Sequence, residues 1–231
     1  MSEDSQKFIE EEEETEEVLT LPQKLLKAFI KMGDLFVLNV YFTITSLPII
    51  TIGASLTALY TVTYKMVDDH EDSIHKAYLK AWKENFKQST IMWLIDLLYI
   101  GMMVIEYIYV LRNENQLSKV LFILVGTQFF FLAFAYPLQF PLLARYENSV
   151  GRTMFNSLII AFSRPGVWFK MFFIWSLPFA LYYVSIKALI YTWYLWGLLL
   201  TSLFAYICST FLMPFFRQME EQSDEQEAEE A

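Results

Sequence analysis

Residues Thr90 to Leu111 read TIMWLIDLLYIGMMVIEYIYVL, an apolar run with only two charged side chains and the length of a bilayer-crossing helix. The bilayer core holds no water for backbone polar groups, so a run of this kind must be a helix whose N–H and C=O groups bond internally. Similar apolar runs lie on both sides of it. The sequence therefore predicts an all-α fold, a polytopic membrane helix bundle.

The composition supports a membrane protein. Of 231 residues, 55% are hydrophobic and 18% aromatic, and only 19% are charged. Charged residues approach a quarter of a typical soluble domain, so this chain is too apolar for that class. We expect a single transmembrane helical domain over residues 21–217.

The net charge of −9 is concentrated at the two ends of the chain. Residues 1–17 hold nine acidic residues against one lysine, and residues 219–231 hold seven acidic residues and no lysine or arginine. Like charges at this density repel and offer no apolar surface to bury. We predict acidic disordered tails over residues 1–20 and 218–231. They are either solvated ends or docking tails for a basic partner or for the chain's own lysine-rich loop.

Basic residues indicate how the helices are oriented. Six crossings with a cytoplasmic N-terminus place 14 Lys or Arg inside and 3 outside, whereas omission of the short second candidate gives at best 10 to 7. Cytoplasmic loops carry the excess of Lys and Arg. We therefore predict six transmembrane helices in the cell membrane with both termini cytoplasmic, or alternatively five plus a re-entrant segment. The candidate spans are residues 35–50, 53–67, 90–111, 120–143, 167–186 and 188–214.

A turn that reads SLPIITIG, from Ser46 to Gly53, joins the first two candidate spans. Proline removes a backbone donor, threonine can cap the next helix, and glycine permits a close approach. Small residues then recur at i, i+4 spacing, which lets helices pack closely in lipid, and we expect an asparagine in the first span to bond across to the second. A helix N-terminus at a proline break can also bind an anion or a polyol, which stays an alternative. The predicted turn and helix-packing site consists of Asn39, Pro48, Thr51, Gly53, Ala54 and Ala58.

Residues 65–87 predict an amphipathic, basic, cytoplasmic helix. From Ile74 to Phe86, apolar residues recur at helical spacing while lysines gather towards the other side. Such a helix either lies among anionic headgroups or docks to a protein partner. The candidate cytoplasmic contact comprises Lys76, Lys80, Trp82, Lys83, Asn85, Phe86 and Lys87.

The third candidate span contains two carboxylates, Asp96 and Glu106, and a carboxylate in lipid is costly enough to mark a candidate functional site. Together with Asn39 they form a candidate intramembrane polar site, which serves either structural anchoring or the passage of a proton or substrate. The sequence has no phosphate-binding loop, metalloprotease histidine pair or nucleophile elbow. We expect no enzyme activity, no catalytic residue, no cofactor, no metal and no nucleic-acid partner.

The chain resembles the YesL family in four places: Asn39, Leu47–Gly53 (LPIITIG), Ala58–Tyr60 (ALY) and Ala81–Gln88 (AWKENFKQ). The dense similarity covers residues 33–93. Members of this family are small bacterial multi-spanning membrane proteins with a domain of unknown function, often encoded beside carbohydrate-uptake and polysaccharide-degrading genes. The resemblance implies an accessory role in sugar import and supplies no catalytic residues.

The expected function is that of an integral membrane accessory or assembly protein linked to carbohydrate (oligosaccharide) uptake. Its expected partners are the lipid bilayer and a carbohydrate ABC transporter or another membrane protein. The alternative is a small-solute or sugar transporter with a polar path through the bundle. ABC permease subunits dock on their ATPase through a Glu-Ala-Ala loop followed by glycine, and residues 73–88 and 154–168 lack this pattern.

Overall fold

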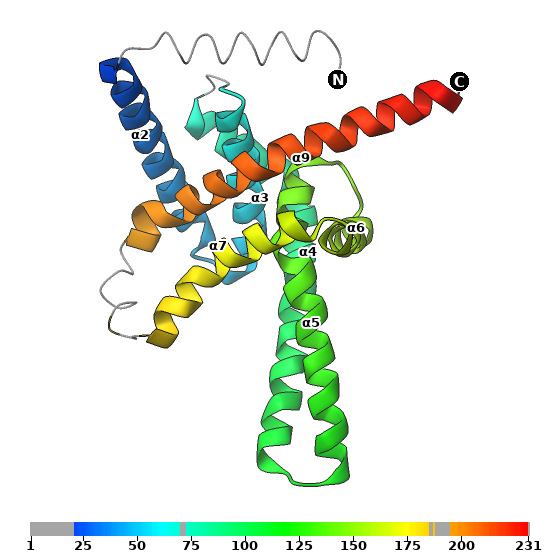
Figure 1. The fold of residues 1–231 in the computed structure, drawn as a ribbon. Coiled ribbons are helices and arrows are strands. Elements are labelled where there is room, and N and C mark those ends of the chain that lie inside the picture. The colour runs from blue at the N-terminus through cyan, green and yellow to red at the C-terminus, as the bar shows by residue number, and fades with distance from the viewer. Residues whose placement is uncertain (1–20, 70–72, 185–186, 188–194, 231) are drawn as a thin grey trace.

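A computed structural model describes residues 21–69, 73–184, 187 and 195–230. Within these residues every element of secondary structure is helical, so the all-α prediction is confirmed. Figure 1 shows the arrangement. The elements are α2 (Leu21–Ser46), the 3₁₀ turn η1 (Ile49–Thr51), α3 (Ile52–Val67), α4 (Ile74–Arg112), α5 (Gln116–Arg145), α6 (Val150–Ser163), α7 (Pro165–Val184), the π-helical turn η2 (Trp196–Leu200) and α9 (Thr201–Glu230).

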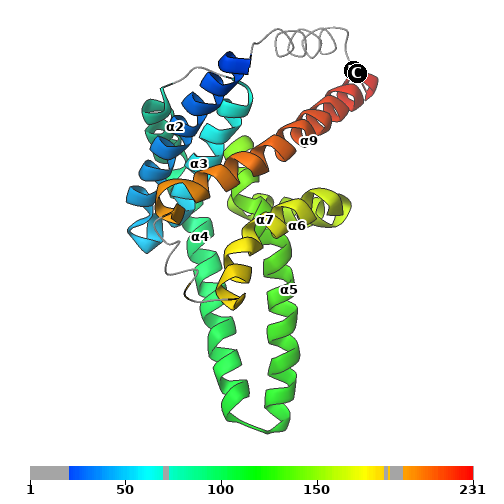
Figure 2. The ribbon, with the colours of Figure 1, turned by 60° about the vertical axis from the view of Figure 1, so that its left-hand side comes forward.

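Helix α3 is the centre of the bundle. Twelve of its 16 residues are buried, and it packs against α2, α4, α5 and α9. Many of its side chains are small, among them Gly53, Ala54, Ser55 and Ala58, which lets neighbouring backbones approach closely. In Figures 1 and 2, α9 crosses obliquely over this helix.

Helices α4 and α5 form an antiparallel hairpin that projects from the rest of the molecule (Figures 1 and 2). Helix α4 has 39 residues and is therefore about 58 Å long, nearly twice the hydrocarbon thickness of a bilayer. Its first half packs beside α3. Its second half pairs with α5 and leaves large apolar side chains exposed, such as Ile105 at 70%.

The described residues do not confirm six spans. Among them, three helical stretches are long and apolar enough to cross a membrane: Ile74–Arg112, Gln116–Arg145 and Trp196–Gln222. A fourth results if the α6–α7 pair, bent by 107°, counts as one broken span. These apolar helices indicate a membrane protein.

One contact explains why the structure does not reproduce six separate membrane crossings. The sequence prediction puts the Pro48–Gly53 turn at the outer membrane face and residue 90 at the cytoplasmic face. In the structure these two regions touch, because the Trp93 Nε1–H donates to the Ile49 carbonyl oxygen at 2.7 Å. Helix α3 therefore lies beside the lysine-bearing half of α4, and the predicted cytoplasmic helix and third span form one continuous helix.

The C-terminal boundary also differs from the prediction. Helix α9 continues through Glu230, so residues 218–230 are helical where an acidic disordered tail was expected. Two causes are visible in this segment: Glu, Gln and Ala are good helix formers, and Glu220 is held by Arg145. The predicted N-terminal tail, residues 1–20, lies outside the described residues.

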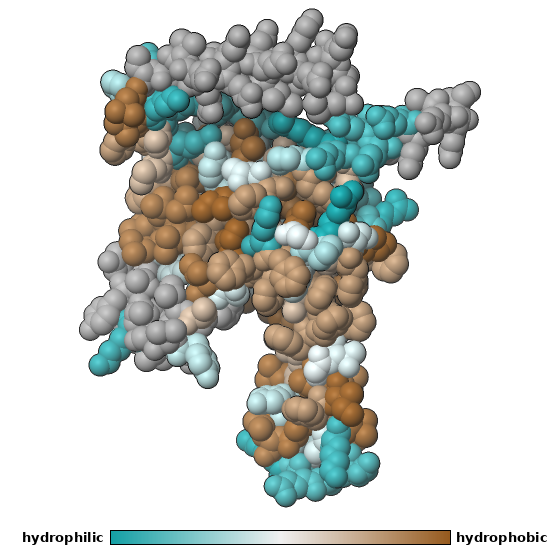
Figure 3. Space-filling view, viewed as in Figure 1, coloured by the Kyte–Doolittle hydropathy of each residue, from teal (hydrophilic) through white to brown (hydrophobic). Residues whose placement is uncertain are grey.

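Figure 3 shows how hydropathy is distributed over one face of the molecule. Hydrophobic residues cover the shaft of the hairpin and much of the body, and hydrophilic residues gather at the hairpin tip and at the opposite end. The tip joins α4 to α5 through residues 113–115. The opposite end holds the start of α2, the end of α3 and the polar part of α9 (Figure 1).

Candidate functional site

Gly53 lies where three helices meet. A Cβ atom added to this residue would be 2.5 Å from the Ser89 carbonyl oxygen, 2.6 Å from Trp93 Cβ and 3.2 Å from Phe140 Cε1. The first two neighbours are a backbone atom and a Cβ, which no side-chain rotation can move. The start of α3 can therefore touch α4 and α5 this closely only with glycine at this position. Ala54 and Ala58, the next predicted packing residues, are fully buried.

Thr51 contributes to the turn in a different way from the one predicted. Its Oγ1–H donates to the Thr45 and Pro48 carbonyl oxygens at 2.6 and 2.7 Å, and its side chain makes no capping bond to α3. The backbone of Thr51 is already helical, so the side chain lies over the preceding turn. The hydroxyl thus ties η1 to the end of α2, with Pro48 preceding η1 as its N-cap residue.

Asn39 bonds to a different helix from the one predicted. Its Nδ2–H₂ group donates to the carbonyl oxygens of Trp196 at 2.9 Å and Gly197 at 2.6 Å, and its Oδ1 accepts from the Ser202 backbone N–H at 2.7 Å. All three partners belong to η2 and the start of α9, not to α3. A π-helical turn leaves backbone groups without regular α-helical partners. The fully buried Asn39 amide supplies partners there and joins α2 to α9.

Polar side chains of α3 bind its neighbours in the same manner. Ser89 of α4 donates to the Thr57 hydroxyl at 2.9 Å, and Thr63 shares a 2.7 Å hydrogen bond with Ser209 of α9. The Tyr64 hydroxyl donates to the Pro141 carbonyl oxygen of α5 at 3.0 Å. These hydroxyls stabilise contacts between helices.

The predicted intramembrane polar residues do not come together. Asp96 is 2% exposed and accepts a hydrogen bond from the Gln139 side-chain amide of α5. Glu106 lies ten residues further along α4, about 15 Å by helix rise, and its Oε2 is buried without a hydrogen-bond partner in the described part of the chain. Asn39 contacts neither carboxylate. The partner that holds Asp96 is Gln139, which is not among the predicted site residues.

The lysines of the predicted cytoplasmic contact are exposed on the first half of α4. Lys80 makes a loose i, i+4 pair with Glu84 at 3.9 Å, and the rings of Trp82 and Phe86 pack against each other at 4.7 Å. Asn85 donates back to its own helix. The residues that share this exposed basic face are Lys76, Lys80, Lys83 and Lys87.

Ion pairs connect four segments at the end of the molecule that lies opposite the hairpin tip. Asp69, in the turn after α3, accepts from Lys27 and Lys31 of α2 at 3.1 and 3.3 Å. Arg217 of α9 binds Asp68 at 2.6 Å. Arg145, at the end of α5, makes a two-bond pair with Glu220 of α9 at 3.0 and 2.8 Å. The carboxylates at this end thus bind cations of α2, α5 and α9.

Four charges of this cluster, those of Lys31, Asp69, Arg145 and Glu220, have displaced pKa values, and the first two illustrate the causes. Partial burial would raise the pKa of Asp69, but the hydrogen bond from Lys27 and the charge of Lys31 outweigh it and lower the pKa. Burial would lower the pKa of Lys31, but Tyr206, whose ring centroid lies 5.0 Å away, and Asp69 outweigh it and raise the pKa. Both shifts favour the charged forms.

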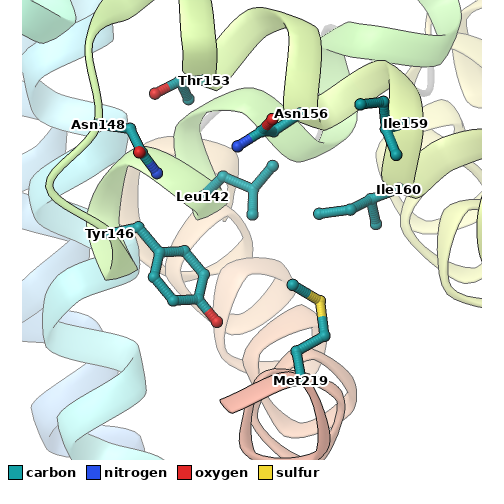
Figure 4. A pocket seen from close by; sticks show the side chains of 8 residues that line it. All are labelled: Leu142, Tyr146, Asn148, Thr153, Asn156, Ile159, Ile160 and Met219. Atoms are coloured by element: carbon teal, nitrogen blue, oxygen red, sulfur yellow. The ribbon is translucent and has the colours of Figure 1, made fainter. Parts of the chain in front are cut away.

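Two recesses lie near the end of α5. The first, about 310 Å³, is seen in Figure 4 between α5, α6 and α9. The Tyr146 ring and the Met219 side chain close one side of it and Asn156 faces it from α6. The second, about 860 Å³, lies between α4 and residues 147–150 and includes Glu84 and Lys87. Both are surface recesses, and neither has Asn39, Asp96 or Glu106 in its lining.

No group of three or more His, Cys, Asp or Glu that could hold a metal ion occurs among the described residues. His75 Nδ1 shares a 2.7 Å hydrogen bond with the Tyr41 hydroxyl, and Cys208 is a buried free thiol. His70 lies outside the described residues.

Comparison with known proteins gives one match. No curated protein and no solved structure matches the chain. Residues 35–107 match the model of a family described as a protein of unknown function, DUF624. The matched region begins within α2, includes η1 and α3, and ends in the second half of α4. A DUF624 domain is therefore present at residues 35–107, which fits a YesL-type protein.

Proposed function

We propose that this chain is an integral membrane accessory or assembly protein that acts by contact with a carbohydrate-uptake system and does not conduct the solute. The observation that carries the proposal is the use of the buried polar side chains. Asn39, Thr57, Thr63 and Asp96 all bond across helix interfaces. Residues that join helices are poorly placed to exchange partners with a moving solute.

We place the α4–α5 hairpin across the membrane, with its tip outside and both termini in the cytoplasm. Residues 90–111 of α4 have the length of a bilayer core and only two charged residues, Asp96 and Glu106. The first half has four exposed lysines, which favour the cytoplasmic surface. In this arrangement α3 lies at the cytoplasmic end of the hairpin. The six-span arrangement is the competing one.

The proposed contact is the exposed basic face of α4, formed by Lys76, Lys80, Lys83 and Lys87. Exposed lysines on one helix face, of which Lys80 makes only a loose pair with Glu84, suit an acidic protein surface. The Trp82–Phe86 pair on the same stretch of helix supplies an apolar anchor. The partner class, a carbohydrate ABC transporter, rests on the YesL resemblance alone.

A charge reversal tests this contact. The variant carries glutamate at the four lysines of the basic face, and the matched control carries glutamate at Arg112 and Lys119 near the hairpin tip. A tagged oligosaccharide ABC transporter should co-purify with the wild type and the tip variant but not with the basic-face variant, and cellular uptake of labelled oligosaccharide should fall in parallel. Equal co-purification and uptake in all three strains would contradict the proposal.

A transporter remains the second candidate, because Glu106 has a buried oxygen without a partner in the described residues. Purified protein in proteoliposomes distinguishes the two. The accessory function predicts no accumulation of labelled oligosaccharide without the partner system. Accumulation that is lost on replacement of Glu106 by glutamine would overturn it.

The membrane placement is tested by cysteine accessibility. Cys208 is buried and is the only cysteine, so a Cys208→Ala background permits single labels. If the hairpin crosses and α3 lies at its cytoplasmic end, a cysteine at Ile50 is protected from an impermeant reagent in intact cells, and one at Asn115 reacts. Reaction at both positions would instead support six spans.

A further inference from the structure

Helix α6 carries an apolar face that no part of the described chain covers. Phe155, Ile159 and Phe162 are 64%, 47% and 54% exposed, and their i, i+4, i+7 spacing aligns them along one side of the helix. The opposite side, which includes Thr153, Ser157 and Ile160, is buried against the body of the molecule. The helix is therefore enclosed on one face and apolar on the other.

This apolar face is continuous with the exposed surface of the hairpin. The Phe162 ring stacks on Phe134 at 4.9 Å and lies 6.2 Å from Phe130, both on α5. Phe130 is itself exposed and is followed by the exposed Phe131. One uninterrupted apolar surface thus extends from α6 to the shaft of α5, where the second half of α4 and α5 have the length of a bilayer core.

The arrangement of α6 suits the membrane plane. Figure 1 shows this helix end-on beside an upright hairpin, and Figure 2 shows it lying across the direction of the hairpin. It then bends by 107° into α7 at Arg164 and Pro165. Trp168, just beyond the bend, is buried against Phe134 and donates to the Ala133 carbonyl oxygen. Trp168 thus fixes the corner against α5 and holds α6 across the direction of the hairpin.

Cations flank the apolar face. Arg152 at the start of α6 and Arg164 at its end are both exposed. Among the described residues neither has a side-chain hydrogen bond or ion pair, whereas Arg145 and Arg217 are each paired with a carboxylate. Unpaired arginines beside an apolar helix face match the anionic headgroups of a bilayer, because phosphate accepts their hydrogen bonds.

We propose that α6 is an interfacial helix: its Phe155–Ile159–Phe162 face inserts into the cytoplasmic leaflet, and Arg152 and Arg164 bind anionic lipid headgroups. The inference rests on the proposed crossing of the hairpin. It gives the protein a second attachment to the membrane, one that is selective for lipid. The lipid recognised would be one with a net negative phosphate headgroup, such as phosphatidylglycerol.

Nitroxide labels on single cysteines test the depth. In the Cys208→Ala background, labels at Phe155 and Ile159 should respond most to a lipid-soluble relaxation agent at the headgroup level. A label at Leu98, exposed on the hairpin, should lie deeper, and a label at Lys80 should respond only to a water-soluble agent. A deep Leu98 label with water-exposed Phe155 and Ile159 labels would overturn the inference while leaving the hairpin crossing intact. A water-exposed Leu98 label would contradict the crossing itself.

Lipid selectivity is the second readout. Vesicles that contain brominated phosphatidylglycerol should quench a fluorophore at Ile159 more strongly than vesicles with brominated phosphatidylcholine. Replacement of Arg152 and Arg164 by glutamine should reduce this preference by roughly five-fold per arginine, and the same changes at Arg112 and Lys119 should not. An unchanged preference would overturn the arginine role. Disulfide cross-linking between two Phe155→Cys chains, with no lipid quenching, would show that a second copy covers this face.

Discussion

Replacing Gly53 by alanine tests the contact between α3 and the α4–α5 hairpin. The new Cβ would lie 2.5 and 2.6 Å from the Ser89 carbonyl oxygen and Trp93 Cβ, two atoms fixed to the α4 backbone. The helices must therefore move apart, which costs about 1 to 3 kcal/mol for overpacking, while the helix propensity of alanine returns at most about 1 kcal/mol. We expect a net loss of about 1 to 2 kcal/mol, or about 2 to 8 °C in melting temperature.

Gly101→Ala is the matched control, because a Cβ at that position of α4 meets nothing within 4 Å. It should leave the melting temperature unchanged or raise it. Thermal aggregation of detergent-extracted protein measures both variants, and Gly53→Leu should also reduce the amount of folded protein in the membrane. If Gly53→Ala melts at or above the temperature of Gly101→Ala, α3 does not lie against α4 as described.

Three further predictions concern bonds between helices. Asn39→Leu removes the side-chain acceptor of the Ser202 N–H, whereas the Gly197 and Trp196 carbonyl oxygens still accept from the Thr43 and Thr201 hydroxyls. We therefore expect a loss of about 1 to 3 kcal/mol, measured by thermal melting; an unaltered melt would refute this linkage. Because the pKa of Asp69 is lowered in the folded state, this carboxylate stabilises the fold above its unfolded pKa, and the stabilisation is lost as pH falls below about 4. In an Asp69→Asn variant, the free energy of unfolding should fall less between neutral and acid pH than in the wild type. The two should differ by less than about 1 kcal/mol, because the ion pair is exposed. Arg145→Gln should accelerate amide hydrogen exchange in α9 after Glu220. Arg145→Lys should have an intermediate effect, because lysine keeps the charge but not the two-bond geometry. Identical exchange in the two variants would show that this pair does not order α9.

The sequence predicted the helical class and the turn at Pro48 because these depend on local properties: apolar length and the missing backbone donor of proline. It did not predict that residues 74–112 form one helix. Lysine gives way to apolar residues near Thr90, but no glycine or proline lies between Lys87 and that residue. A change from lysine-bearing to apolar sequence therefore does not mark the end of a helix. Pro137 and Pro141, in turn, lie within α5 and do not end it.

The sequence pointed to Asn39 and Asp96 but did not identify their hydrogen-bond partners. The partners of Asn39 are 157 to 163 residues away along the chain, and Gln139 is 43 residues from Asp96. Their pairing depends on how α9 and α5 pack, which no local pattern encodes. Only Gln139 left a sequence signal, as an amide within an apolar run.

The unbroken course of α4 fixes the angular relation between its basic face and the side that meets α5. A straight helix advances 100° per residue, so the direction of the basic face is determined by the direction in which Asp96 meets Gln139 of α5. One inserted residue near Thr90 would turn the lysines by about a quarter of a revolution relative to the hairpin seam. Because Ser89 and Trp93 of the same helix are bonded to Thr57 and Ile49, α4 cannot turn about its long axis without breaking its contacts with α3, and the basic face keeps one direction relative to the hairpin.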